Sequence, residues 1–181
     1  MKRKYQIGIL IIILVLITQF LNMQVNHNAN TSKYIQMNYS REWRVLFLNI
    51  QQLERAITDS INNKEHGNEN EKIKMIIREI NLINYSLMGY VRLNQKYGLS
   101  IYPMLDLLKP IESKIDSNEN LTKEDLMIVK AITELNEKYS VIRQPALYES
   151  NSSRYKSINL PTEVIHYVDE IEILEEKLSL Q

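Results

Sequence analysis

The sequence predicts an all-α protein, with an N-terminal single transmembrane helix followed by an antiparallel bundle of four to five helices. Three observations predict this fold. An apolar run with basic residues before it stands near the amino terminus. Apolar residues recur at three- and four-residue steps through most of the remaining chain. Only four Gly and four Pro occur in 181 residues, too few for the tight turns of a β-rich fold.

The apolar run lies in residues 1–30, which we predict to be a signal-anchor with a short linker. Basic residues at positions 2–4 precede an unbroken apolar stretch over residues 7–17, the arrangement of an export signal. A helix over residues 5–25 would be about 31 Å long, which matches the roughly 30 Å hydrocarbon core of a bilayer. We therefore expect residues 5–25 to contact the lipid bilayer as a single span.

The same segment would be removed if it carried a signal-peptidase site, which needs small residues in an A-x-A-like pattern. Ala29 is the only alanine nearby, and His27 stands two positions before it. An uncleaved anchor is therefore predicted, and secretion after cleavage is the alternative. Basic residues that flank a membrane helix stay in the cytoplasm. We therefore expect the amino terminus on the cytoplasmic side of the cell membrane and residues 31–181 on the outer side, as one extracytoplasmic helical domain.

Composition limits the classes of function open to this outer domain. The chain has no Cys, so it has neither disulfides nor thiolate metal sites, which favours a bacterial cell envelope over a eukaryotic ectodomain. Three of the 22 basic residues precede residue 30, whereas all 22 acidic residues follow it, and nucleic-acid binding is not expected. No Gly-rich phosphate loop, paired His or hydrolase motif occurs. The sequence predicts no cofactor, no metal and no enzymatic activity.

The first helix of the outer domain is predicted over about residues 33–62. Its apolar residues share one face of a helix, which is typical of packing against other helices. This stripe consists of Trp43, Phe47, Ile50, Leu53, Ile57 and Ile61.

A second helix is predicted over about residues 70–97, after a polar loop at residues 62–72. Gly98 follows this helix as a candidate left-handed cap. The third segment begins at Pro103, which suits the first turn of a helix. Pro110 predicts either a break or a kink within that segment.

The fourth helix is predicted to begin with a capping arrangement of Thr122 and Asp125 and to end before Pro145. Residues 144–160 are rich in Ser and Tyr and predict a loop. Pro161 then opens a last helix, which completes the bundle.

Two stretches are candidate contact surfaces. The first is formed by Trp43 and Phe47, near the start of the first outer helix. The second is the last helix, where six acidic residues, among them Glu170, Glu172 and Glu176, oppose a single Lys. This excess of negative charge suits a basic partner, although a solvent-facing helix surface explains it equally well.

Two further patterns have a functional and a structural interpretation. Glu163 and His166 form an E-x-x-H step, with Glu170 one turn beyond. Helical di-iron sites need two such steps and this chain has one, so we interpret these residues as a solvated face. Four tyrosines would line a shallow ligand groove between the second and third helices: Tyr85, Tyr90, Tyr97 and Tyr102. In the alternative interpretation these rings are part of the core.

These observations favour a non-catalytic protein that acts as an interaction or scaffold component of a bacterial cell envelope. Its expected partner is another envelope protein or a second copy of the chain. The alternative is a small-ligand-binding or sensory helical domain that acts through a membrane partner. A hydrolase with two carboxylates from different helices is a third hypothesis, for which the sequence singles out no pair.

Overall fold

The computed structural model describes residues 2–62, 67–90, 101–148 and 161–179. Side chains are described for all of these except residues 2–13, 27–32, 35, 67–68, 89–90 and 179. Within the described ranges the chain forms five α-helices and two short 3-10 helices, and it contains no strand. The predicted all-α class is confirmed.

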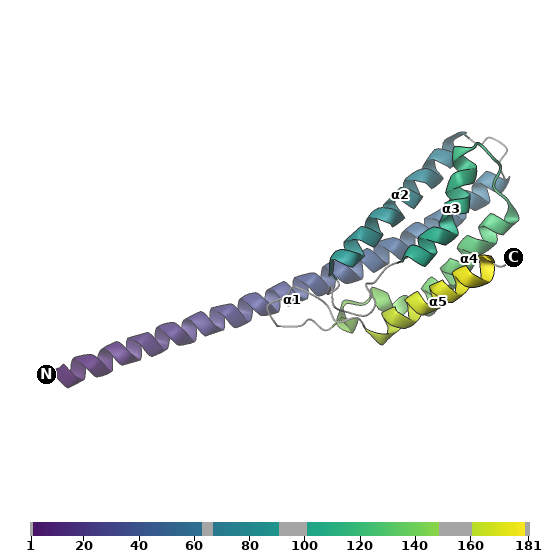
Figure 1. The fold of residues 1–181 in the computed structure, drawn as a ribbon. Coiled ribbons are helices and arrows are strands. Elements are labelled where there is room, and N and C mark those ends of the chain that lie inside the picture. Colours follow the sequence, from purple (N-terminus) through teal and green to yellow (C-terminus); the bar gives the residue numbers. More distant parts are fainter. Residues whose placement is uncertain (1, 63–66, 91–100, 149–160, 180–181) are drawn as a thin grey trace.

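The elements are, in chain order, α1 (Lys2–Asn62), α2 (Gly67–Tyr90), α3 (Tyr102–Asp116), α4 (Lys123–Lys138), η1 (Ser140–Arg143), η2 (Pro145–Leu147) and α5 (Thr162–Ser179). Figure 1 shows α2, α3, α4 and α5 gathered around the carboxyl-terminal part of α1 as a helical bundle. The amino-terminal part of α1 projects alone from one end of this bundle (Figure 1).

α1 is a single helix of 61 residues, about 90 Å long at the normal helical rise. The linker expected before residue 33 is therefore helical, and the predicted boundary between residues 30 and 31 falls inside α1. Among the described residues, no helix combines the length and the apolar character that crossing a membrane requires. The side chains of residues 5–13, the first part of the predicted membrane segment, lie outside the described residues.

The core of the bundle forms where the apolar stripe of α1 packs against α2 and α4. Ile50, Leu53 and Ile57 are fully buried there, at the spacing that the sequence predicted. α2 contributes a matching stripe, which consists of Ile73, Ile76, Ile77, Ile80, Ile83 and Leu87. Burial of each such side chain is worth about 1.5–3 kcal/mol, so these two stripes contribute substantially to the stability of the bundle.

α2 begins earlier than predicted, whereas α3 has Pro103 in its first turn as expected. α2 begins at Gly67, so the polar residues 67–72 are helical and do not belong to a loop. α3 is one helix that continues through Pro110, whose side chain is exposed to solvent. The proline therefore leaves the buried face of α3 uninterrupted. Gly98, the predicted cap, lies outside the described residues.

Two capping motifs fix the turn between α3 and α4. Asn118 has a left-handed backbone with a φ of 54°, and its N–H donates to the carbonyl of Ile115 at 3.2 Å. The next N–H along the chain donates to the carbonyl of Lys114 at 2.7 Å, which completes a Schellman motif. α4 then begins with a capping box formed by Thr122 and Asp125, as predicted.

Candidate interaction surface

Trp43 and Phe47, predicted to form a contact surface, lie inside the bundle. Their side chains are 0% and 2% exposed. The ring of Tyr167 on α5 stands edge-on to Trp43, with 5.4 Å between the ring centroids. α5 therefore covers the aromatic face that the sequence left open. This corrects the assignment, since both residues belong to the core.

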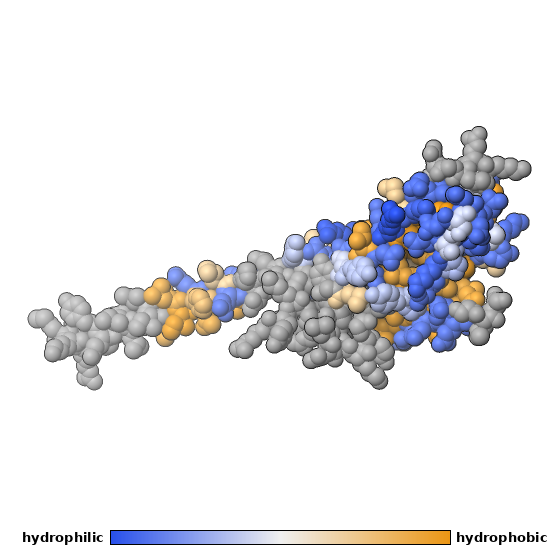
Figure 2. Space-filling model, turned by 45° about the horizontal axis from the view of Figure 1, so that its top comes forward, coloured by the Kyte–Doolittle hydropathy of each residue, from blue (hydrophilic) through white to orange (hydrophobic). Residues whose placement is uncertain are grey.

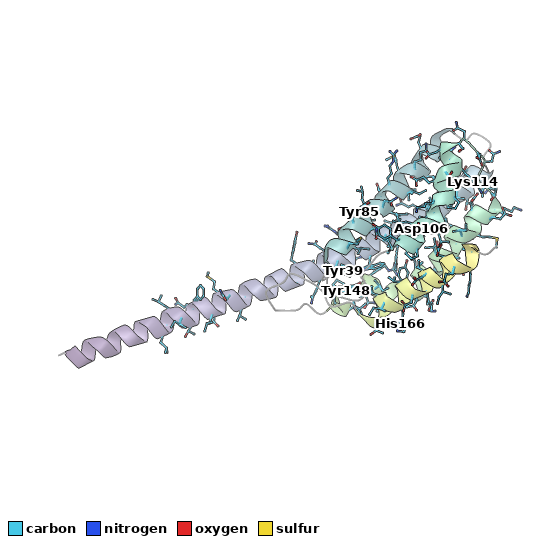
Figure 3. The ribbon with its side chains drawn as sticks, viewed as in Figure 1. Tyr39, Tyr85, Asp106, Lys114, Tyr148 and His166 are labelled. Carbon is cyan, nitrogen blue, oxygen red and sulfur yellow. The ribbon has the colours of Figure 1, made fainter. Side chains whose placement is uncertain are left out.

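The two residues are part of an aromatic cluster that joins α1 to α5 and to the segment after α4. The ring centroid of Tyr39 lies 6.3 Å from that of Trp43 and 4.8 Å from that of Tyr148. Tyr139 meets Tyr167 at 5.8 Å. These edge-to-face pairs are worth about 0.5–1.5 kcal/mol each beyond the area they bury. Figure 3 shows Tyr39 and Tyr148 together where α1 enters the bundle.

The hydroxyls of two buried tyrosines in this cluster have acceptors within the bundle. The hydroxyl of Tyr167 donates to Oδ1 of Asn136 at 2.7 Å, and the hydroxyl of Tyr148 donates to the carbonyl of Ile142. Burial raises the pKa of both Tyr167 and Tyr148, because a phenolate would lose its hydration. Both hydroxyls therefore stay protonated and serve as structural donors.

Glu170 on α5 binds two residues at the end of α4. Its carboxylate accepts hydrogen bonds from Nζ of Lys138 at 2.6 and 2.7 Å, and from the hydroxyl of Tyr139 at 2.7 Å. The hydrogen bond from Lys138, followed by that from Tyr139, lowers the pKa of Glu170 below its usual value. Glu170 is one of the three acidic residues that were predicted to contact a partner. In the structure its carboxylate joins α5 to the end of α4 within the same chain.

A shallow groove of about 570 Å³ runs between α4 and α5 beside this cluster. Apolar and charged side chains both contribute to it. The lining residues are Ala131, Glu134, Leu135, Lys138, Glu170, Ile173, Leu174 and Lys177. Because Ile173 is 48% exposed, the groove presents apolar surface to solvent.

Glu172 and Glu176 lie on the outer side of α5, next to the groove. Both side chains are exposed, and so is Asp169 one turn earlier. Residues three and four positions apart share a helix face, so these carboxylates form a continuous acidic surface. That Glu172 and Glu176 contact a partner stays a prediction.

The E-x-x-H step of α5 is not built into a metal site in the part of the chain that the structure describes. His166 is exposed, and Figure 3 shows it on the outer side of α5. Glu170 is bound to Lys138 instead. No group of three His, Asp or Glu side chains that would hold a metal ion occurs among the described side chains.

The predicted tyrosine groove between α2 and α3 falls partly on described residues. Tyr85 on α2 and Tyr102 at the start of α3 are both exposed to solvent. The side chains of Tyr90 and Tyr97 lie outside the described residues. The groove therefore stays a prediction.

An ion pair that the sequence did not reveal joins α3 to α4. The side chain of Asp125 is 3% exposed, and both its oxygens lie 2.8 Å from Nζ of Lys114. The N–H and the hydroxyl of Thr122 also donate to it, at 2.7 and 3.0 Å. Asp125 therefore serves both in the capping box of α4 and in an ionic contact with α3 (Lys114 is labelled in Figure 3).

Comparison of the chain with protein-family models, curated proteins and solved structures found no match. No relative therefore transfers a role to any residue of this chain. Its function is inferred from the contacts and exposed surfaces described above.

Proposed function

We propose that the chain is a membrane-anchored extracytoplasmic helical protein, which acts through protein contacts as an interaction or scaffold component of a bacterial cell envelope. The observation that carries the proposal is the surface of the projecting part of α1. Eight large apolar side chains there are 48 to 70% exposed: Leu14, Val15, Leu16, Ile17, Phe20, Leu21, Met23 and Val25. Figure 2 shows this apolar surface on the projecting helix.

The free energy of hydrating this surface supports a lipid environment. Full burial of a large apolar side chain is worth about 1.5–3 kcal/mol, so eight half-exposed ones cost on the order of 10 kcal/mol in water. That is comparable to the whole stability of a typical domain, about 5–15 kcal/mol. Several of the eight are consecutive, and each residue turns a helix by about 100°, so they face all sides. Lipid would cover every side of this helix, whereas a single neighbouring helix would cover only one side. An apolar surface on all sides therefore favours a lipid environment.

The distribution of charge supports an orientation with the amino terminus in the cytoplasm. Basic residues occupy positions 2–4, and no acidic residue occurs before residue 31. Lys and Arg next to a membrane helix stay on the cytoplasmic side. The bundle, with all 22 acidic residues, would then lie outside.

Two ion pairs between helices support contacts over catalysis as the role of the bundle. Asp125 is engaged by Lys114 and Glu170 by Lys138, and both pairs join two helices of the chain. The surface that we assign to a partner is the outer face of α5 with Glu172 and the exposed Ile173 of the adjoining groove. A partner surface with basic and apolar side chains complements it.

The anchor is tested by fractionating cells that make the full chain with a carboxyl-terminal tag and by measuring its intact mass. We expect a membrane-bound product of full mass whose tag is removed by protease added outside the cell. Ile17→Arg places a charge in the apolar segment and should release the protein from the membrane. Leu82→Arg is the matched control, since Leu82 is 67% exposed on α2. Full-mass protein outside the membrane fraction would contradict the anchor, as would equal behaviour of the two variants.

The contact surface is tested with a photoreactive side chain at position 173 of the membrane-bound protein. We expect crosslinks to a defined envelope protein, which the double charge reversal Glu172→Lys, Glu176→Lys should abolish. Glu79→Lys, an exposed reversal on α2, is the control and should leave the crosslinks unchanged. Crosslinks that resist the double reversal, or that Glu79→Lys abolishes as well, would remove the basis for this surface.

The groove between α4 and α5 favours one alternative, a small-ligand-binding or sensory domain that acts through a membrane partner. Its volume of about 570 Å³ falls in the range of small-molecule sites, roughly 300–1,000 Å³. A true ligand would raise the melting temperature of the full chain, because binding to the folded state alone adds RT ln(1 + [L]/Kd) to its stability. The effect should disappear in Ile173→Asp, and a screen of envelope metabolites without any such ligand would reject this alternative.

A further inference from the structure

A second apolar surface lies on α1, on the side away from the bundle core. Tyr34, Met37, Val45 and Leu48 form it, with 37 to 68% of their surfaces exposed. At 3.6 residues per turn, these four side chains lie within about 80° of one another around α1. Trp43, which is fully buried, points to the opposite side of the helix. We call these four residues the outer strip of α1.

We propose that the outer strip pairs with the same strip of a second copy of the chain, in a parallel dimer of α1 helices that forms in the membrane. This inference rests on the proposed anchor. α1 continues without a break from the outer strip into the apolar segment at residues 14–25. Two copies anchored in one bilayer therefore point in the same direction and hold their strips at the same height. Two-fold symmetry then places each residue opposite its own copy, so the strip needs no other surface to be complementary.

The size of the outer strip explains why the pairing needs the membrane. A standard protein interface removes about 800 Å² of surface from each partner. Four side chains, each already partly buried, fall short of that area. Attachment to one bilayer confines two copies to the same thin layer in the same orientation, which raises their effective concentration without any new contact. A helix pair that is too weak to form between freely diffusing molecules is then populated.

Charge within the outer strip limits the affinity of the pair without preventing it. Arg41 lies between Met37 and Val45 on the same face, and its side chain is 64% exposed. In the dimer it would approach its own copy, and like charges repel. Its guanidinium lies 3.5 Å from the carboxylate of Glu42 in the same chain, which offsets part of that repulsion. Arg41→Leu should therefore strengthen the dimer.

The absence of cysteine from the chain makes the test direct. Val45→Cys and Leu48→Cys are introduced singly into the full-length protein in membranes and oxidised, and disulfide-linked dimers appear at twice the monomer mass. Leu82→Cys on α2 and Met127→Cys on α4 are the controls, with 67 and 68% of their parent side chains exposed. We expect positions 45 and 48 to yield about tenfold more dimer than the controls, which corresponds to about 1.4 kcal/mol of preference.

Substitutions within the outer strip should change the yield in opposite directions. In the Val45→Cys background, Arg41→Leu should raise the yield of dimer, and Leu48→Asp should lower it about tenfold. Leu82→Asp is the matched control for Leu48→Asp, since both parent side chains are exposed and only one lies in the strip. It should leave the yield unchanged.

The outcomes separate this dimer from the proposed anchor. If the protein is membrane-bound but forms disulfides equally at positions 45, 48, 82 and 127, the proposed dimer is wrong and the anchor is unaffected. The same holds if no disulfide forms at positions 45 and 48. Crosslinks from these positions to a different polypeptide also overturn the dimer. Protein that fractionates outside the membrane overturns both proposals together.

Discussion

Replacing Lys114 with Met tests how far the ion pair between α3 and α4 holds that end of the bundle together. Asp125 is 3% exposed and lies 2.8 Å from Nζ of Lys114 through both oxygens. Without the cation its carboxylate stays buried, with Thr122 as its partner in the capping box. Breaking a buried ion pair from one side costs about 3–5 kcal/mol. Because the side chain of Lys114 is 30% exposed, we expect the lower end, about 3 kcal/mol.

The assay uses the fluorescence of Trp43, the single Trp of the chain. This side chain is fully buried in the aromatic cluster, so its emission changes when the bundle unfolds. Urea titration of the full-length protein in detergent gives the free energy of unfolding for wild type and variant. On heating, a loss of about 3 kcal/mol should lower Tm by about 6–12 °C for a domain of this size.

A double variant separates the ion pair from the packing around it. In Lys114→Met with Asp125→Asn the carboxylate charge is gone, while the amide oxygen still accepts from the N–H of Thr122. Most of the lost stability should return, so the two substitutions should be strongly non-additive. A loss below about 1 kcal/mol in Lys114→Met, or purely additive effects in the double variant, would refute the reasoning.

Three further predictions concern the aromatic cluster and the contact between α4 and α5. Phe47→Ala should cost about 3–5 kcal/mol in urea unfolding, against less than about 0.5 kcal/mol for Leu82→Ala, because Phe47 alone of the two is buried. Tyr167→Phe should cost about 1–2 kcal/mol in the same assay, since the amide of Asn136 loses the 2.7 Å hydrogen bond inside the core. Glu170 has a pKa below its usual value in the folded chain, so its stabilising effect is present above the unfolded pKa and is lost as pH falls through the folded one. The difference in stability between wild type and Glu170→Gln should therefore be largest near neutral pH and vanish in strong acid, and a difference that grows in acid would contradict this sign.

The helices and one of their caps are predictable from the sequence because both depend on residues a few positions apart. The stripe that contains Ile50 and Ile57 repeats at the period of an α-helix, and these residues are buried as expected. The capping box of Thr122 and Asp125 likewise spans three positions. Pro110 was expected either to break or to kink this segment. α3 is one helix through Pro110, so there is no break, and a kink at this position stays a prediction.

The burial of the aromatic residues was also available from the sequence. Trp43 precedes Ile50 by seven residues, two turns of a helix, so both occupy the same face. If Ile50 faces the core, Trp43 does too. Tyr167 stands three residues after Val164 and four before Ile171, and it shares their buried face in the same way. Periodicity is therefore the sequence signal that places the ring of Tyr167 in the core.

The ionic contacts lie beyond any local pattern. Lys138 and Glu170 are 32 residues apart, and they meet because α4 and α5 pack side by side. Lys114 and Asp125 are brought together by the turn between α3 and α4. Which charge finds which partner depends on the packing of whole helices, and the spacing of residues in one helix carries no information about it.

The unbroken course of α1 has a mechanical consequence for the bundle. Each residue adds about 1.5 Å and about 100° of rotation, so an insertion of two residues near position 30 would turn α5 by about 200° around the helix axis. An insertion of seven would turn it by only about 20°. Residues 25–62 span about 55 Å, so tilting the amino-terminal segment by about 10° would swing the far end of the bundle by about 10 Å. Because α1 is one continuous helix, the number of its residues determines the direction in which each surface of the bundle faces relative to the amino-terminal segment.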